Sequence, residues 1–230
     1  MRRTVRFAVV GEGRDEHGFS AKGPSLRELP AGSLQGALVT LVSRLLRERF
    51  GLTPQPVAWS PPRLSHLGAD YSPSKIVSDV NYLPRLLDNL FCPIRMEPHH
   101  PHPLDLVVLS VDSEYKHSFT RACRVLRPEI AARTISLVFE PELEVLLVQG
   151  KEALEDAYGI PRCQTKPPAR EGNLKARLEE WRGQYAPKEP KLDAAAKTRI
   201  AGFLKISPGT SLEELAVWTV LTQRLEEILT

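Results

Sequence analysis

Acidic residues follow three apolar segments of this 230-residue chain, at the points where those segments end. They are Glu12, Asp15 and Glu16 after the first segment, Asp112 and Glu114 after the second, and Glu140, Glu142 and Glu144 after the third. Carboxylate oxygens suit Mg²⁺ or Mn²⁺, and paired ions stabilise the attacking and leaving oxygens of a phosphodiester displacement. We expect Asp112 and Glu114 to bind metal, with Glu12 as a further ligand or as the acid/base. Glu142 or Glu144 would complete a second ion, although the sequence leaves these roles interchangeable.

The spacing of Asp112 and Glu114 favours joint metal binding. Residues two apart in extended backbone point to the same face, roughly 6–7 Å from each other. Acids after strands also have a simpler explanation, since they favour the positive ends of helix dipoles and are common in exposed loops. The hypothesis therefore depends on the three acidic clusters meeting at one edge of a sheet.

The apolar patterns predict the elements that would bring these acids together. Continuous β-branched and apolar runs predict buried strands at residues 4–10, 104–112 and 134–140. Helical spacing of apolar residues predicts helices at 33–51, at 72–91 with a kink or division at Pro84, at 116–132, and from Pro141 onward. Strands that alternate with helices predict an α/β fold, a mainly parallel sheet flanked by helices, with ligand sites at the carboxyl ends of its strands.

The chain changes character after Gly159. Prolines gather at residues 54–62, 93–103 and 161–190, which we expect to be loops or linkers. The last of these is rich in Lys and Arg, and apolar spacing predicts helices at 173–185, 192–204 and 211–229. We therefore expect a core over residues 1–159 and, over 160–230, a basic connector with a helical C-terminal extension that caps the core or binds a partner.

Basic residues lie close to the predicted acidic edge. Arg14, Lys116, His117 and Arg121 are candidates for contacts with nucleic-acid phosphates. Further candidates are Arg124, Arg127, Lys166, Arg170, Lys175 and Arg177. His117 is also a candidate for moving a proton. The alternative is a solvated charged surface, since the net charge of +3 permits a polyanionic partner without requiring one.

Other signals in the sequence are weaker. The Gly11-Glu-Gly13 loop lacks the third glycine of a dinucleotide-binding turn, and no phosphate-binding loop for ATP is present. The cluster Glu97, His99, His100 and His102 contains zinc-ligand types, but its spacing matches no standard zinc motif.

The cysteines bear on the compartment of the protein. Cys92, Cys123 and Cys163 are odd in number and form no metal or nucleophile motif, which favours a reducing cytoplasm. The apolar run before Gly11 is too short for a signal peptide or a membrane span, so we expect no membrane association.

The acidic segments resemble, in order, the motifs of Toprim nucleases related to the overcoming-lysogenization-defect family. FAVVGEGRDE resembles the strand that ends in Glu-Gly, VVLSVDSE resembles the Asp-x-Asp strand end, and FEPELEVLLV resembles the Pro-Glu-x-Glu helix start. Together these cover about residues 4–150. Glu114 departs from the pattern, because it stands where the family has the second Asp.

The resemblance implies a Toprim-like core that carries out Mg²⁺-dependent cleavage of nucleic acid, as a DNA endonuclease or nickase. The C-terminal pattern from KTRIAGFL onward resembles small Toprim proteins encoded beside ATPases in bacterial defence clusters, which implies antiphage defence with an ATPase partner. Two alternatives stay open: a non-catalytic Toprim subunit that binds nucleic acid or mediates assembly, and a Mg²⁺-dependent phosphotransfer enzyme for a small substrate. The sequence does not predict the oligomeric state.

Overall fold

The structure, a computed structural model, describes residues 3–11, 25–28, 36–60, 77–91, 103–162, 164–170 and 172–230, with the main chain alone for 25–28, 58–60 and 89. Its strands are β1 (Thr4–Val10), β2 (Ser25–Glu28), β3 (Thr53–Ser60), β4 (Leu106–Asp112) and β5 (Thr134–Phe139). Its helices are α2 (Ala37–Glu48), α4 (Leu83–Phe91), α5 (Lys116–Arg124), α6 (Pro128–Ala131), α7 (Glu144–Leu147), α8 (Lys151–Ala157), α9 (Leu174–Tyr185), α10 (Ala194–Phe203) and α11 (Ala216–Leu229). The described residues also form the 3₁₀ turns η2 (Ser113–Tyr115) and η3 (Ser211–Glu214).

The five strands form one sheet in the order β2-β3-β1-β4-β5. Strands β3, β1, β4 and β5 are parallel, and β2 adds an antiparallel edge. The prediction of an α/β fold with a mainly parallel, helix-flanked sheet is confirmed. The strand that comes first in the chain, β1, lies between β3 and β4, so the order of the strands reverses beside it.

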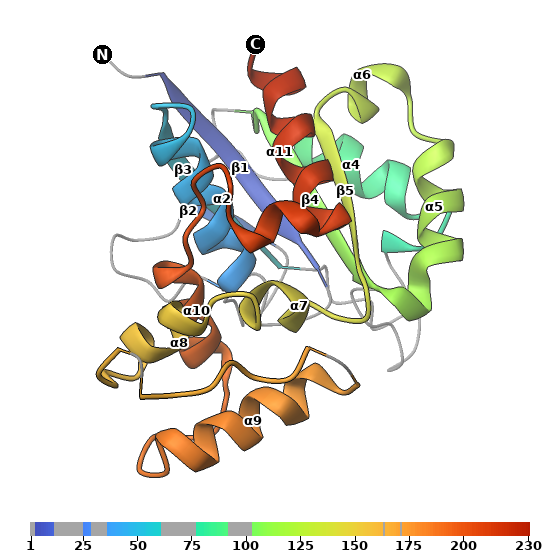
Figure 1. The fold of residues 1–230 in the computed structure, drawn as a ribbon. Coiled ribbons are helices and arrows are strands. Elements are labelled where there is room, and N and C mark those ends of the chain that lie inside the picture. The colour runs from blue at the N-terminus through green and yellow to red at the C-terminus, as the bar shows by residue number, and fades with distance from the viewer. Residues whose placement is uncertain are drawn as a thin grey trace.

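Helices cover both faces of this sheet (Figure 1). On β1, Val5, Phe7 and Val9 face a core shared with α2, α10 and α11. The alternate residues Ala8 and Val10 face a second core with α4, α5 and α6. Because successive strand residues point to opposite faces, a strand that is buried on both sides must be continuously apolar.

Strand β3 lies where the prolines had predicted a loop. The main-chain N–H of Thr53 donates to the main-chain carbonyl of Arg3, so the N–H groups of alternate β3 residues face β1. Pro54 and Pro56 fall between them and face the outer edge, where a missing N–H breaks no bond of the ladder. Strand β2 pairs only from Val57 onward, beyond both prolines. The prolines therefore mark an edge of the sheet.

Three predicted helices are divided or shortened at identifiable residues. Pro128 begins α6, so the predicted helix at 116–132 is split into α5 and α6. Pro84 lies in the first turn of α4 and does not kink it. Pro141 follows a cis peptide bond, and the predicted helix there becomes α7 and α8, divided near Gly150. A side chain at Gly150 would collide with Leu204, at the end of α10.

The C-terminal helices complete the main hydrophobic core. Trp181, Ile200 and Trp218 belong to the same buried cluster as Leu38 and Leu45 of α2. This cluster runs across the predicted boundary at residue 159, so residues on both sides of that boundary are packed together. None of the helices in the described ranges is long and apolar enough to cross a membrane.

Trp218 on α11 provides a test of this shared core. It is 1 % exposed, and Trp218→Ala should lower the free energy of unfolding by about 3–5 kcal/mol, because a large cavity is left behind. Gln223→Ala, at an exposed position of the same helix, should change it by less than about 0.5 kcal/mol. Urea denaturation measures both. A Trp218→Ala protein as stable as the parent would mean that α11 contributes nothing to the core.

Candidate functional site

The candidate site lies at the carboxyl ends of β1 and β4, where the strand order reverses. Val10 is in register with Leu109, so the two parallel strands end at the same edge of the sheet. In sheets of this class, ligands bind at the reversal point, beyond the carboxyl ends of the strands. Gly11, the residue after β1, is buried at this edge. The predicted residues Glu12 and Arg14 lie outside the described residues.

Asp112 and Glu114 are both at this edge but in different backbone environments. Asp112 is the last residue of β4, half-buried and opposite Phe139 of β5. Glu114 is exposed on the 3₁₀ turn η2. The prediction that both lie on one face of an extended strand is wrong, because the chain turns at Ser113. Joint metal binding would require Glu114 to reach Asp112 across this turn.

The loops after β4 and β5 contact each other beside these acids. The main-chain N–H of Ser113 donates to the carbonyl of Pro141 at 3.3 Å. The Lys116 ammonium pairs with the Glu140 carboxylate, and both side chains are more than half exposed. Exposed pairs of this kind contribute less than about 1 kcal/mol, so Lys116 can exchange Glu140 for a ligand phosphate at little cost. Nothing in the sequence signalled Glu140 as the partner of Lys116.

Glu142 and Glu144 bind the C-terminal helices. The Glu142 carboxylate accepts from the main-chain N–H of Lys175, in the first turn of α9, at 3.2 Å. The Glu144 carboxylate forms a buried ion pair with Lys197 of α10. Within the described ranges, no three His, Cys, Asp or Glu side chains come close enough together to hold a metal ion. The structure thus does not bring Glu142 and Glu144 together with Asp112 and Glu114 as a ligand group.

A row of exposed basic side chains leads away from Glu114 along α5. His117, Arg121 and Arg124 follow one another at helical spacings of four and three, and all three are exposed. Residues with these spacings share one face of a helix. This α5 row contains two of the predicted phosphate contacts, His117 and Arg121.

Cys123 lies on α5, where its thiol is hydrogen-bonded with the hydroxyl of Ser136 on β5 at 3.3 Å. Burial raises the pKa of the Cys123 thiol, and the hydrogen bond lowers it less. A raised pKa keeps the group as a thiol at neutral pH, which agrees with a packing role and not with a nucleophile. Cys92, Cys163 and the histidine cluster at 99–102 lie outside the described residues.

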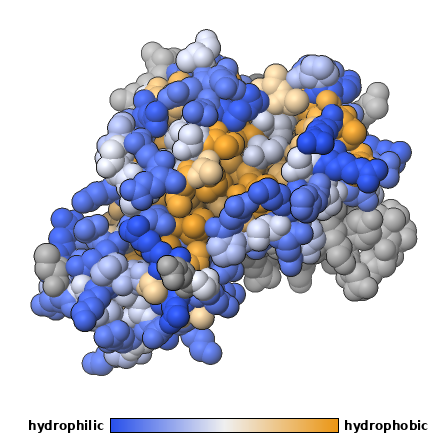
Figure 2. Space-filling model, turned by 45° about the vertical axis from the view of Figure 1, so that its right-hand side comes forward, coloured by the Kyte–Doolittle hydropathy of each residue, from blue (hydrophilic) through white to orange (hydrophobic). Residues whose placement is uncertain are grey.

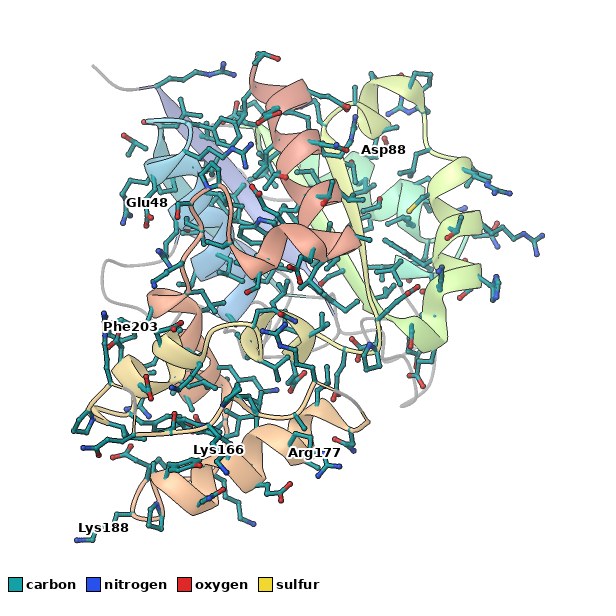
Figure 3. The ribbon with its side chains drawn as sticks, in the orientation of Figure 1. Glu48, Asp88, Lys166, Arg177, Lys188 and Phe203 are labelled. Carbon is teal, nitrogen blue, oxygen red and sulfur yellow. The ribbon has the colours of Figure 1, made fainter. Side chains whose placement is uncertain are left out.

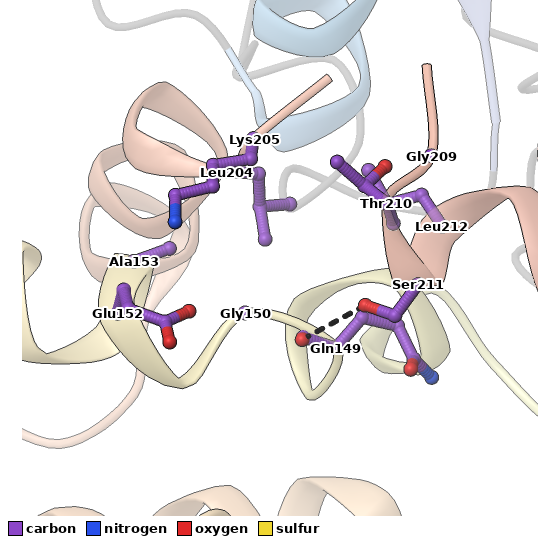
Figure 4. A pocket seen from close by; sticks show the side chains of 10 residues that line it. All are labelled: Gln149, Gly150, Glu152, Ala153, Leu204, Lys205, Gly209, Thr210, Ser211 and Leu212. Carbon is purple, nitrogen blue, oxygen red and sulfur yellow. Dashed lines mark hydrogen bonds between the residues drawn. The ribbon is translucent and has the colours of Figure 1, made fainter. Parts of the chain in front are cut away.

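A small pocket of about 220 Å³ lies between α8 and the segment that joins α10 to η3 (Figure 4). The hydroxyl of Ser211 donates to the carbonyl of Gln149 across it. Lys205 and Glu152 bring opposite charges to its lining. None of the residues predicted for the acidic site lines this pocket.

No family model, curated protein or solved structure matches this chain. The likeness to Toprim nucleases therefore consists of the ordered sequence motifs alone.

The buried pair of Glu144 and Lys197 generates a prediction about stability. Glu144→Leu and Lys197→Met should each lower the free energy of unfolding by about 3–5 kcal/mol, because a buried charge loses its partner. The double variant Glu144→Leu/Lys197→Met should be more stable than either single variant, because it leaves no unpaired charge. Chemical denaturation of the three proteins measures these differences.

The matched control is Glu180→Gln, which breaks the exposed pair between Glu180 and Arg177. It should lower the free energy of unfolding by less than about 1 kcal/mol. A loss in the double variant equal to the sum of the two single losses would show that Glu144 and Lys197 do not interact energetically.

Proposed function

We propose that this protein is a Mg²⁺-dependent nuclease that hydrolyses phosphodiester bonds of nucleic acid at the carboxyl edge of its sheet. The observation that carries the proposal is the strand-order reversal between β1 and β4, whose carboxyl ends, at Val10 and Asp112, lie at the same edge of the sheet. In the proposed site, Glu12, Asp112 and Glu114 bind Mg²⁺ or Mn²⁺, and the metal lowers the pKa of the attacking water. The Toprim resemblance extends the proposal to DNA cleavage in the cytoplasm, in antiphage defence with an ATPase partner.

The distribution of charge supports a nucleic-acid substrate. Residues 161–191 contain eight Lys and Arg against four Asp and Glu, a net charge of +4, whereas the rest of the chain carries −1. The described carboxylates of this segment, Glu179, Glu180 and Glu189, each pair with an arginine. Five of its exposed cations have no carboxylate partner among the described residues: Lys166, Arg170, Lys175, Lys188 and Lys191. A surface with surplus cations matches a chain of phosphates.

This basic segment is anchored beside the candidate site. The contact from Lys175 to Glu142 fixes the beginning of α9 to the loop that follows β5. Figure 1 shows α9 below α7, on the side of the sheet to which β1 points its carboxyl end. Lys166, Arg177 and Lys188 lie on this lower layer in Figure 3. A strand that reaches the acidic edge would therefore meet cations from α5 on one side and from the α9 layer on another.

A second candidate function is a non-catalytic subunit that binds nucleic acid. It is favoured by the engagement of Glu142 and Glu144 with the C-terminal helices, which leaves a second metal ion without these ligands. In that case the basic surfaces bind nucleic acid, and the edge holds at most one cation. Binding without cleavage, in the presence of Mg²⁺ and of any ATPase encoded beside the gene, would favour this function.

Replacement of Asp112 tests the proposed chemistry. Asp112→Asn should lower Mg²⁺-dependent cleavage by about 100-fold or more, because an amide is a much weaker ligand for this hard cation. Glu114→Gln should also lower Mg²⁺-dependent cleavage. The assay follows the nicking of supercoiled DNA and the cutting of single-stranded DNA and RNA, with Mg²⁺ or with a chelator.

The matched control is Glu129→Gln, an exposed glutamate on α6, which precedes β5 and so lies at the opposite edge of the sheet. Its activity should equal that of the parent. Folded Asp112→Asn and Glu114→Gln proteins that cut as fast as the parent would contradict the proposed site.

The basic segment gives a separate prediction about binding. The triple variant Lys166→Ala/Arg170→Ala/Lys175→Ala should weaken binding to nucleic acid. It should also reduce the slope of log affinity against log salt concentration by about 2–3, because each lost phosphate contact reduces this slope by about 0.9. Fluorescence anisotropy at several salt concentrations measures this slope. The control variant Arg47→Ala/Arg85→Ala/Lys205→Ala removes the same charge from exposed positions elsewhere. Equal slopes for the two triple variants would exclude a specific role of the segment.

A further inference from the structure

The outer edge of β5 carries main-chain polar groups that no other strand in the described ranges uses. The N–H of Val107 on β4 donates to the carbonyl of Arg133, so the odd-numbered residues of β5 direct their main-chain groups toward β4. The even-numbered residues direct theirs outward. At the beginning of the strand, the outward carbonyl of Thr134 accepts from the Arg224 guanidinium of α11.

Farther along β5, the outward groups open into a groove. The main-chain N–H and C=O groups of Ser136 and Val138 have no hydrogen-bond partner in the described part of the chain. Both residues line a groove of about 450 Å³. Its other apolar lining residues include Val145, Leu215, Val217 and Val220. Figure 2 shows apolar side chains gathered across the middle of this face of the molecule.

The two edges of the sheet differ in this respect. Pro54 and Pro56 remove the outward donors from the β3 edge, and β2 covers the rest of that edge. Such features prevent one sheet from pairing with another. The β5 edge has no proline within the strand, and Val220, which lines its groove, is 40 % exposed. The groove is also lined by Lys116, Glu140 and Glu214. An unpaired strand edge beside the apolar residues of α7 and α11 fits an extended strand better than a helix or a small ligand.

We propose that this groove binds β5 of a second copy of the chain, so that two sheets join through antiparallel β5 strands about a two-fold axis at Leu137. With this axis, Ser136 of each copy lies opposite Val138 of the other, and the two residues exchange their outward hydrogen bonds. The inference is independent of the proposed nuclease function.

Charge complementarity supports the same register. An axis at Leu137 places Thr134 of one copy opposite Glu140 of the other. The Arg224 guanidinium, which is bonded to Thr134 and pairs with Glu227, then faces the Glu140 carboxylate of the second copy, which pairs with Lys116 of its own chain. Because the contact is isologous, it closes after two copies and does not extend into a fibre.

Sedimentation equilibrium of the full chain over a range of concentrations tests this interface. The parent protein should be a dimer. Val220→Lys should raise the dissociation constant by about tenfold or more, because a charge enters the apolar groove. The matched control is Val125→Lys on the C-terminal side of α5, since Val125 is 53 % exposed and does not line the groove. It should leave the dissociation constant unchanged.

Ser136→Pro provides a second test that does not depend on the groove walls. It removes an outward N–H while leaving the ladder to β4 intact, so circular dichroism should show a folded protein and the dimer should weaken. A monomeric parent protein at all concentrations would overturn the proposal, and would leave the groove to a strand of a different protein. A dimer that neither Val220→Lys nor Ser136→Pro weakens would overturn it as well.

Discussion

The later parallel strands of this protein lie on both sides of β1, with β3 on one side and β4 and β5 on the other. From β1 the chain passes through the antiparallel edge strand β2, crosses by α2 to β3, and then returns by way of α4 to β4 on the other side of β1. Right-handed crossovers require the connecting helices to change faces when the direction changes, so this single reversal determines which helices cover which face. It also brings the carboxyl ends of β1 and β4 together at one edge of the sheet. The position of the candidate site follows from this constraint and does not depend on which side chains occupy it.

The C-terminal residues are part of the same architecture. In the segment that follows β5, Glu142 accepts a hydrogen bond from the backbone of α9, and Glu144 pairs with the ammonium of Lys197. Helix α10, which carries Lys197, packs against α2 and α8. The loop after β5 therefore has a fixed course, which keeps Glu140 and Pro141 against the end of β4. In this way the extension contributes to the shape of the acidic edge as well as to the core, and it presents a basic layer next to that edge.

Much of the fold could be predicted from local sequence, because buried parallel strands are continuously apolar and helices show their period. Strands β1, β4 and β5 are of this kind. Strand β3 could not be predicted, since Pro54 and Pro56 are compatible with a strand only when their nitrogens face an open edge, and that depends on the neighbouring strands. The positions of Asp112 and Glu114 at one edge followed from the parallel order, but their relative geometry did not, because the turn at Ser113 has no apolar signature. The partners of Glu142 and Glu144 lie more than 30 residues away in the chain and left no local signal.

The buried contact between Glu144 and Lys197 has a consequence for how this sequence can diverge. A substitution at either position alone leaves an orphan charge inside the protein, so a lineage can cross to an apolar pair only through a destabilised intermediate or through a double change. Homologues should therefore carry both charges or neither, and the two positions should covary. The same coupling opposes recombination within the chain, since a C-terminal segment with lysine at 197 is compatible only with a core that supplies the acid.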